Sequence, residues 1–202
     1  IISQELMKQF KNQKDVIQDI ELLSSQVERC NQILKRLSLN PNEEDEFIDE
    51  DLSLKEYLKQ IVISFKETSN KNFILNFDND QNPKKITKSI EIVYGLRNFI
   101  GNANKFSNTS IFISLKSDNK FSEIIIEDDG KGYSNDIMSK IGEPYLKSNS
   151  QSDKKNSGLG LGIFIGKTLL EKNFATIYFG NSLTRSGAQV IIKWKNKDLF
   201  NI

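Results

Sequence analysis

Asp-Asp-Gly-Lys-Gly, at residues 128–132, closely follows the apolar run Ile-Ile-Ile at residues 124–126. The apolar run predicts a buried strand, and the glycines predict a turn that ends it. A carboxylate at a strand end can accept a hydrogen bond from a ligand amino group, and glycines just after it let the backbone approach a flat ring closely. Because acidic-glycine turns also end ordinary strands, this segment is interpreted together with a helix before it and a glycine cluster after it.

The helix before this turn is predicted from about residue 86 to residue 105. Its apolar stripe consists of Val93, Leu96, Ile100 and Ala103. Asn98, Asn102 and Lys105 are spaced i, i+4, i+7 and form a polar line beside that stripe. Two asparagines in register cost helix stability, which favours a binding role: a carboxamide oxygen can ligate Mg²⁺, and a lysine can bind phosphate. The alternative is a solvated polar face in a chain rich in asparagine and lysine.

The glycine cluster Gly-Leu-Gly-Leu-Gly, at residues 158–162, stands at the start of a helix predicted from about residue 161 to residue 172. Glycines there let backbone N–H groups and the helix N-terminus face an anion; a flexible hinge is the alternative. The pattern matches neither a Walker A loop nor a Rossmann fingerprint. The stretch before it, about residues 134–157, is largely too polar to pack. Together these segments predict a nucleotide pocket with a lid.

The composition excludes several kinds of chemistry. The 202 residues carry a net charge of +1 and include no histidine and one cysteine. The charge gives no support for nucleic-acid binding, the lack of histidine excludes histidine acid–base chemistry within these residues, and one cysteine cannot form an internal disulfide, which fits a reducing compartment. No apolar run approaches the length of a membrane span, and no signal-peptide pattern is visible. The first residue is Ile1, so we expect a fragment of a longer chain.

Residues 1–39 predict half of a helical bundle. Residues 1–10 are interpreted as the end of one helix, and after a polar break a second helix carries a heptad seam. The seam consists of Val16, Ile20, Leu23, Val27, Cys30, Leu34 and Leu37. Because so narrow an apolar stripe requires partner helices, we interpret residues 1–39 as a helical-hairpin dimerisation segment. A hairpin folded onto its own domain is the alternative.

Residues 40–51 are interpreted as an acidic linker, and residues 52–202 as one further domain. Ser53 and Glu56 form a capping-box pattern at the start of its first helix. Strands are predicted near residues 73–77, 110–116, 123–127, 175–179 and 188–194. Strands adjacent in sequence, with helices interspersed, predict an α+β fold with one mixed sheet covered on one face by helices.

The order of these segments resembles the N, G1, F and G2 boxes of sensor histidine kinases. The segments are residues 98–107, 128–132, 142–145 and 158–162, and Gly187-Ala188 is similar to a last glycine box. Sensor histidine kinases share the Bergerat (GHKL) ATP-binding fold, so the resemblance implies a two-layer α/β sandwich after the helical hairpin. The resemblance covers the whole chain.

Carried over position by position, the resemblance implies an ATP site. Asp128 would accept the adenine amino group, and Asn102 would ligate Mg²⁺. The residues expected to bind ATP are Asn98, Asn102, Lys105, Phe106, Asp128, Gly130, Gly132, Tyr133, Tyr145, Gly158, Leu159, Gly160, Leu161 and Gly162. Asp129 stands where these kinases usually carry Asn, which is interpreted as harmless because a small polar turn residue suffices there. Leu159 replaces a frequent Thr, which removes one possible hydroxyl contact.

Within the sensor histidine kinases, the sequence most resembles the RegB/PrrB-type redox-responding kinases. This resemblance rests on Gly-Glu-Pro-Tyr at residues 142–145, on the run at residues 162–171 and on Gln-Val-Glu-Arg-Cys at residues 26–30. In that subfamily the phosphoacceptor histidine lies on the first bundle helix, so it would precede this fragment, and the fragment alone is not expected to phosphorylate itself. Cys30 is either a small apolar residue of the seam or, by the resemblance, a redox thiol whose thiolate Arg29 could favour.

The resemblance therefore implies the cytoplasmic kinase core of an inner-membrane bacterial sensor in a two-component system. Its activity would be protein-histidine kinase: transfer of the γ-phosphoryl group of Mg-ATP to a histidine, for relay to a response regulator receiver domain. It would form a homodimer through the helical hairpin and reach the membrane only through a missing N-terminal part. One alternative is a GHKL ATPase or Ser/Thr-directed anti-sigma kinase, which the bundle seam disfavours. The other is a non-catalytic dimerisation and docking module, which the intact Asn102, Asp128 and glycine segments disfavour.

Overall fold

The computed structural model describes residues 52–80, 85–86, 89–144 and 161–200. The predicted helical hairpin of residues 1–39, the linker before residue 52 and residues 145–157 of the predicted lid lie outside the described residues. Across the described ranges, no helix combines the length and the apolar character that crossing a bilayer requires.

The main sheet has five strands in the spatial order β2-β4-β5-β7-β6. Their bounds are β2 Asn72–Asp80, β4 Ser110–Ser117, β5 Phe121–Asp128, β6 Thr176–Asn181 and β7 Ala188–Lys195. β2 pairs in parallel with β4, and the other neighbours pair in antiparallel fashion. The predicted mixed sheet is therefore confirmed.

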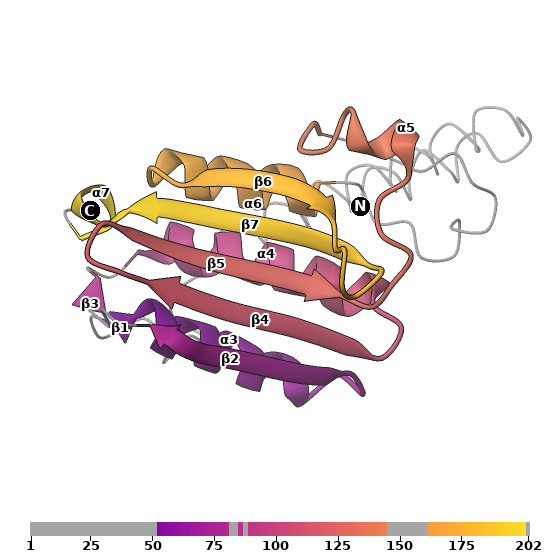
Figure 1. Cartoon of the computed structure of the whole chain (residues 1–202), viewed down its shortest axis with the longest axis horizontal. Helices are drawn as coiled ribbons and strands as arrows, with labels where there is room; N and C mark the ends of the chain where they lie inside the picture. The colour runs from indigo at the N-terminus through magenta and orange to yellow at the C-terminus, as the bar shows by residue number, and fades with distance from the viewer. Residues whose placement is uncertain (1–51, 81–84, 87–88, 145–160, 201–202) are drawn as a thin grey trace, which may run out of the picture. The chain divides into compact units, whose positions relative to one another are not determined.

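Three helices, α3 Leu54–Lys66, α4 Ile90–Phe106 and α6 Gly162–Lys172, cover one face of this sheet (Figure 1). Two further helices have a single turn each: α5 Asn135–Met138 follows β5 in the chain, and α7 Asn196–Leu199 follows β7. The predicted capping box is present at the start of α3, where the side chains of Ser53 and Glu56 each accept from the backbone N–H of the other. The result is the predicted two-layer α/β sandwich.

The core lies between the helices and the sheet. Side chains alternate along a strand, so every second residue of β4, β5 and β7 faces the helices. The fully buried side chains of these strands include Ile111, Ile113, Leu115, Ile124, Ile126, Ile192 and Trp194. The predicted apolar stripe of α4 is also confirmed, because Val93, Leu96, Ile100 and Ala103 are all buried.

The long helix begins later than the sequence predicts. Lys85–Ile86 forms the short strand β3, which pairs with β1 (Leu52–Ser53), and α4 starts only at Ile90. Ser89 is the N-cap of α4, and its Oγ accepts a hydrogen bond from the Ile92 N–H at 3.3 Å. The predicted start near residue 86 is therefore wrong. The reason is that a single buried isoleucine satisfies a helical stripe and a short strand equally well.

Candidate functional site

Asp128 is the last residue of β5, and its side chain is 3% exposed. Its Oδ1 accepts hydrogen bonds from the N–H groups of Gly130 at 2.8 Å and Ala188 at 3.2 Å. Within the described residues both bonds fall on Oδ1, which leaves Oδ2 for a donor group of a ligand. Burial raises the pKa of Asp128; the two N–H groups oppose this, and the neighbouring charge of Asp129 adds to it. A buried carboxylate with one uncommitted oxygen fits the predicted acceptor of an amino group.

Gly130 and Gly187 let three chain segments meet around this carboxylate. A Cβ atom on Gly130 would lie 2.2 Å from the Phe106 carbonyl oxygen and 2.9 Å from Asp128 Oδ1. A Cβ atom on Gly187 would lie 2.1 Å from the Asp128 carbonyl oxygen. Both distances to carbonyl oxygens are far inside van der Waals contact, so no other residue fits at either position. The glycines thus bring the end of α4 and the start of β7 against Asp128.

Asn181 fixes the backbone that follows this turn. Its Oδ1 accepts from the Tyr133 N–H at 2.6 Å, and its Nδ2 donates to the Tyr133 carbonyl oxygen at 2.9 Å. Gly132, just before, has φ +70, and a Cβ there would lie 2.6 Å from Asn181 Oδ1. The sequence does not predict this role, because an asparagine after a strand is equally typical of a simple turn.

The Tyr133 ring lies edge-to-face against Phe179, with 6.5 Å between ring centroids. Phe179 in turn contacts Phe99 of α4 in the same geometry, at 5.9 Å. Burial raises the pKa of Tyr133, and the charge of Asp128 raises it further, so the phenol stays neutral. Tyr133, a predicted site residue, thus belongs to a row of aromatic rings that reaches α4 through Phe179 and Phe99.

Asp129 holds the loop between α4 and β4. Its carboxylate accepts from the N–H groups of Asn108 at 2.8 Å, Thr109 at 3.0 Å and Ser110 at 3.1 Å, and from the Thr109 hydroxyl. Partial burial acts to raise the pKa of Asp129, but these hydrogen bonds outweigh it and lower the pKa to about 2. An ionised carboxylate is the acceptor that suits three successive N–H donors. Asp129 is therefore a specific anchor of this loop, rather than the interchangeable turn residue that the sequence suggests.

Asn98 and Asn102 face the start of α6. A Cβ atom on Gly162, the first residue of α6, would lie 3.2 Å from Asn102 Nδ2 and 3.5 Å from Asn98 Oδ1. Asn98 Nδ2 donates to the Tyr94 carbonyl oxygen at 2.8 Å. Asn102 Nδ2 is buried and has no hydrogen-bond partner among the described residues. A buried amide without a partner is costly to the fold, so its place beside the first turn of α6 fits a ligand-binding role.

Among the described residues, no side chain caps the first turn of α6. Leu161 is its N-cap and makes no side-chain capping hydrogen bond. Backbone N–H groups of a first helical turn lack partners within the helix, and together with the helix dipole they favour a negative group. Leu161 and Gly162, both predicted site residues, thus present N–H groups next to the two asparagines.

The remaining predicted site residues divide into two sets. Lys105 and Phe106 end α4; both are exposed, and Lys105 Nζ lies 5.0 Å from the Phe106 ring centroid. Tyr145, Gly158, Leu159, Gly160 and the proposed redox residue Cys30 lie outside the described residues. In the described ranges, no group of three or more His, Cys, Asp or Glu side chains is placed to hold a metal ion. A magnesium ion at this site would therefore depend on the Asn102 amide and on phosphate oxygens, a ligand set that Mg²⁺ accepts.

Residues 87–198 match the protein-family model described as histidine kinase-, DNA gyrase B-, and HSP90-like ATPase. Sensor histidine kinase RegB of Cereibacter sphaeroides is 29% identical over 193 residues, which cover 90% of this chain and 41% of RegB. Sensor histidine kinase CpxA of Escherichia coli is 30% identical over 78 residues, 39% of this chain and 17% of CpxA. The chain thus spans about two-fifths of the length of RegB.

Solved structures with the same fold include the mycobacterial sensor histidine kinase MprB and full-length ShkA in complex with AMPPNP. MprB superimposes with a TM-score of 0.60 at 18% identity, over 72% of this chain and 97% of that chain. ShkA superimposes with a TM-score of 0.61 at 18% identity, over 96% of this chain and 41% of that chain. At this level of identity the likeness establishes the fold.

Proposed function

The chain belongs to the histidine kinase-, DNA gyrase B-, and HSP90-like ATPase family, and we propose that it is the ATP-binding kinase core of a sensor histidine kinase. Its phosphoacceptor would lie outside these 202 residues, because they contain no histidine. The observation that carries the proposal is the buried Asp128, whose Oδ1 accepts from two backbone N–H groups, while Oδ2 accepts from none of the described residues. That arrangement suits an acceptor for the adenine amino group.

The phosphates would bind at the other half of the site. The N–H groups at the start of α6 would contact phosphate oxygens, and Asn102 would ligate Mg²⁺, with Asn98 and Lys105 beside it. Bound Mg²⁺ would neutralise charge on the triphosphate, which is its usual contribution to phosphoryl transfer. The buried Nδ2 of Asn102, which has no hydrogen-bond partner among the described residues, is a donor that suits a phosphate oxygen. Tyr145, Gly158, Leu159 and Gly160 would complete the site by the resemblance to the kinase boxes.

The partners follow from the relatives. The similarity to RegB over 90% of this chain supports a homodimer through residues 1–39, a response regulator receiver domain as the phosphoryl acceptor, and a place on the cytoplasmic side of a membrane sensor. Cys30 would respond to oxidant near the dimer axis. Oxidation is expected to give a reversible intermolecular crosslink or change of assembly that is lost in Cys30→Ser, and an unchanged response in that variant contradicts the redox role.

The experiment that tests the proposal combines binding and transfer. Calorimetric titration with a non-hydrolysable ATP analogue should show saturable binding that Mg²⁺ strengthens. With labelled ATP, the chain should leave itself unlabelled yet label a separately purified helical hairpin that carries a phosphoacceptor histidine, taken from a sensor histidine kinase. Phosphohistidine is acid-labile and phosphoserine is acid-stable, so an acid wash separates a histidine kinase from a Ser/Thr-directed one. Absence of binding heat would favour the docking module.

A further inference from the structure

The two ends of α6 make different kinds of contact with α4. At its N-terminal end, Gly162 lies against the amides of Asn98 and Asn102, where the phosphates are proposed to bind. At its C-terminal end, the helix stops at Asn173, which is 7% exposed. Asn173 lies next to Ser89, the 3% exposed N-cap of α4. α6 therefore runs antiparallel to α4, from the proposed site to the beginning of α4.

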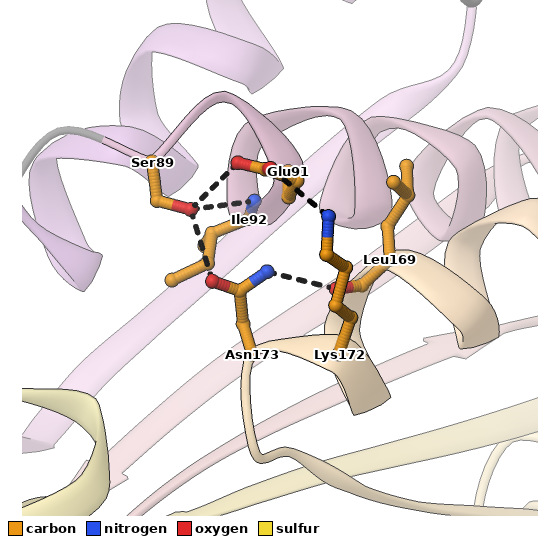
Figure 2. Close-up of polar contacts among 6 residues, drawn as sticks. All are labelled: Ser89, Glu91, Ile92, Leu169, Lys172 and Asn173. Carbon is orange, nitrogen blue, oxygen red and sulfur yellow. Dashed lines mark hydrogen bonds and ion pairs between the residues drawn. The ribbon is translucent and has the colours of Figure 1, made fainter. Parts of the chain in front are cut away.

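The contacts at Asn173 form a buried polar junction (Figure 2). Asn173 Oδ1 lies 3.4 Å from Ser89 Oγ, and Asn173 Nδ2 donates to the Leu169 carbonyl oxygen at 3.0 Å. The Asn173 carbonyl oxygen accepts from Trp194 Nε1 at 3.0 Å. Since Ser89 Oγ also caps α4 by accepting from the Ile92 N–H, one asparagine joins the end of α6 to the start of α4 and to β7.

The neighbouring ion pair does not replace this junction. Lys172 Nζ and Glu91 Oε1 are 3.8 Å apart, but their side chains are 72% and 40% exposed. Exposed pairs of this kind contribute little to a fixed geometry. The buried amide of Asn173 is consequently the polar group that defines where α6 ends.

The middle of the helix pair is in close contact, with the fully buried Leu170 of α6 lying over Gly95 of α4. A Cβ atom on Gly166 would lie 3.1 Å from the Gly95 carbonyl oxygen, and one on Gly95 would lie 2.5 Å from Leu170 Cγ. Interhelical register is set when side-chain ridges of one helix fit grooves of the other. Leu170 provides such a fit at Gly95, whereas Gly166 contributes no side chain, so the contacts at the two ends of α6 add to the axial hold that Leu170 provides.

We propose that Asn173 is a positioning residue for the nucleotide: by bonding Ser89 and capping α6, it fixes the axial position of α6 on α4 and thereby the place of the first turn of α6 beside Asn102. The 11-residue helix transmits this placement over about 16 Å. The ligand class rests on the proposed function, whereas the junction is a property of the fold. A phosphate site depends on donor placement within fractions of an ångström, so a loosened junction weakens nucleotide binding without contacting the nucleotide.

Asn196 supplies a matched control. It is 5% exposed, its Oδ1 accepts from Ser122 Oγ at 2.8 Å, and its Nδ2 donates to the Asp118 carbonyl oxygen at 2.7 Å. This repeats the serine–asparagine–carbonyl pattern of Asn173 at a place that contacts neither α4 nor α6 through these bonds. Asn173→Ala and Asn196→Ala each remove one bond from a serine hydroxyl and one to a backbone carbonyl oxygen, the bonds of Asn196 being the shorter, and only the bonds of Asn173 involve α4 and α6.

The test is the dissociation constant for a Mg-bound non-hydrolysable ATP analogue, measured well below the unfolding temperature of each variant. Asn173→Ala should weaken binding by roughly tenfold, the equivalent of one lost hydrogen bond to the ligand, while Asn196→Ala should stay within about twofold of wild type. If Asn173→Ala does not fold, Ser89→Gly replaces it as the test variant. Glycine keeps most of the N-cap stability but lacks the hydroxyl group that donates to Asn173 Oδ1. Ser89→Thr, which retains the hydroxyl, should restore wild-type affinity.

The outcomes separate this inference from the function on which it rests. If wild type binds and the Asn173 and Asn196 variants bind equally well, the positioning role is overturned and the ATP site stands. Equal weakening in both variants also overturns it, because a general loss of stability then explains the effect. If wild type itself binds no nucleotide, the proposed function falls, and the inference falls with it.

Discussion

Asp128 and Asp129 are adjacent in the chain, and their surroundings shift the pKa values of the two carboxyl groups in opposite directions. Asp128 is buried at the end of β5, and one of its carboxylate oxygens accepts hydrogen bonds from two N–H groups. The carboxylate of Asp129 accepts from three N–H groups and a hydroxyl group. The first carboxyl group keeps an oxygen for a ligand, and the second has its hydrogen-bonding capacity taken up by the α4–β4 loop. One turn thus supplies the proposed binding group and the anchor of the loop beside it.

Asp128→Asn should abolish nucleotide binding while leaving the fold intact. The new amide would face the adenine amino group with a donor, so affinity should fall by roughly 100-fold or more. Because burial raises the folded-state pKa of Asp128, its charged form opposes folding at neutral pH, and stability should not decrease. Calorimetric titration and urea unfolding measure the two effects. Asp118→Asn, at a turn where the carboxylate accepts from Lys120 and Phe121 N–H groups, should leave the affinity unchanged.

Asp129→Asn should lower stability in a pH-dependent way. The folded-state pKa lies near 2, below the usual 3.8, so the carboxylate stabilises the fold above about pH 4 and loses this contribution as the pH falls towards 2. At pH 6 the variant should be less stable by about 1 kcal/mol, allowing for solvent screening, and the difference from wild type should shrink below pH 4. Urea unfolding at several pH values checks this. A difference that stays constant from pH 6 to pH 2.5 contradicts the ionic anchor.

Gly95→Ala and Gly101→Ala should have opposite effects, although both glycines lie in α4. At Gly95 the added methyl group would meet the fully buried Leu170 at 2.5 Å, which should cost about 1–3 kcal/mol. At Gly101 the nearest atom is Phe65 Cζ at 3.4 Å, so the higher helix propensity of alanine should give up to about 1 kcal/mol of added stability. Thermal or urea unfolding of the two variants measures the contrast. Equal effects would show that α4 and α6 do not pack closely at Gly95.

Asn102→Ala should remove the strengthening of nucleotide binding by Mg²⁺ and change the stability of the free protein little. Its Nδ2 has no partner among the described residues, so the loss of the side chain breaks no hydrogen bond of that group. Asn104→Ala is the reverse control on the same helix, because Asn104 Oδ1 accepts from Ser69 Oγ at 2.6 Å. That variant should lose about 1 kcal/mol of stability and keep its affinity. Titrations with and without Mg²⁺ distinguish the two asparagines.

Asn181→Ala should lower stability by about 1–2 kcal/mol, because two hydrogen bonds to the Tyr133 backbone are lost. Asn181→Asp keeps the acceptor for the Tyr133 N–H and loses the donor, so its stability should be intermediate. Urea unfolding ranks the three proteins. If the aspartate variant is no more stable than the alanine variant, the bond to the Tyr133 N–H contributes nothing.

The sequence predicts the centre of the sheet well. In β4 and β5 buried residues alternate with more exposed ones, and the observed strands differ from the predicted ones by at most two residues at either end. β2 is less well predicted: it continues to Asp80, although the apolar pattern stops at Phe77. The reason is that β2 is an edge strand, paired on one side only and with a register shift between Asn76 and Asn79, where polar residues are tolerated.

The candidate site can be predicted from the sequence only where the type of a residue and its place in a helix or strand indicate the same role. Asp128 and the asparagines of α4 combine a candidate ligand-binding side chain with a strand end or a helix face, and the structure places Asp128 at the end of β5 and the asparagines in α4. The anchoring roles of Asp129, Asn173 and Asn181 depend on contacts between segments far apart in the chain. No local pattern distinguishes an asparagine that ends a helix from one that also joins it to a second helix, so these residues emerge only from the three-dimensional structure.

Trp194 gives the protein a built-in optical reporter. It is the chain's one tryptophan, fully buried, and its indole N–H bonds the carbonyl group at the end of α6. Its fluorescence should therefore be that of a hydrogen-bonded indole in an apolar environment. The emission should respond to the position of the C-terminal end of α6 rather than to ligand binding at Asp128. A change of emission on adding ligand would record a movement of the helix as a unit, with no label attached.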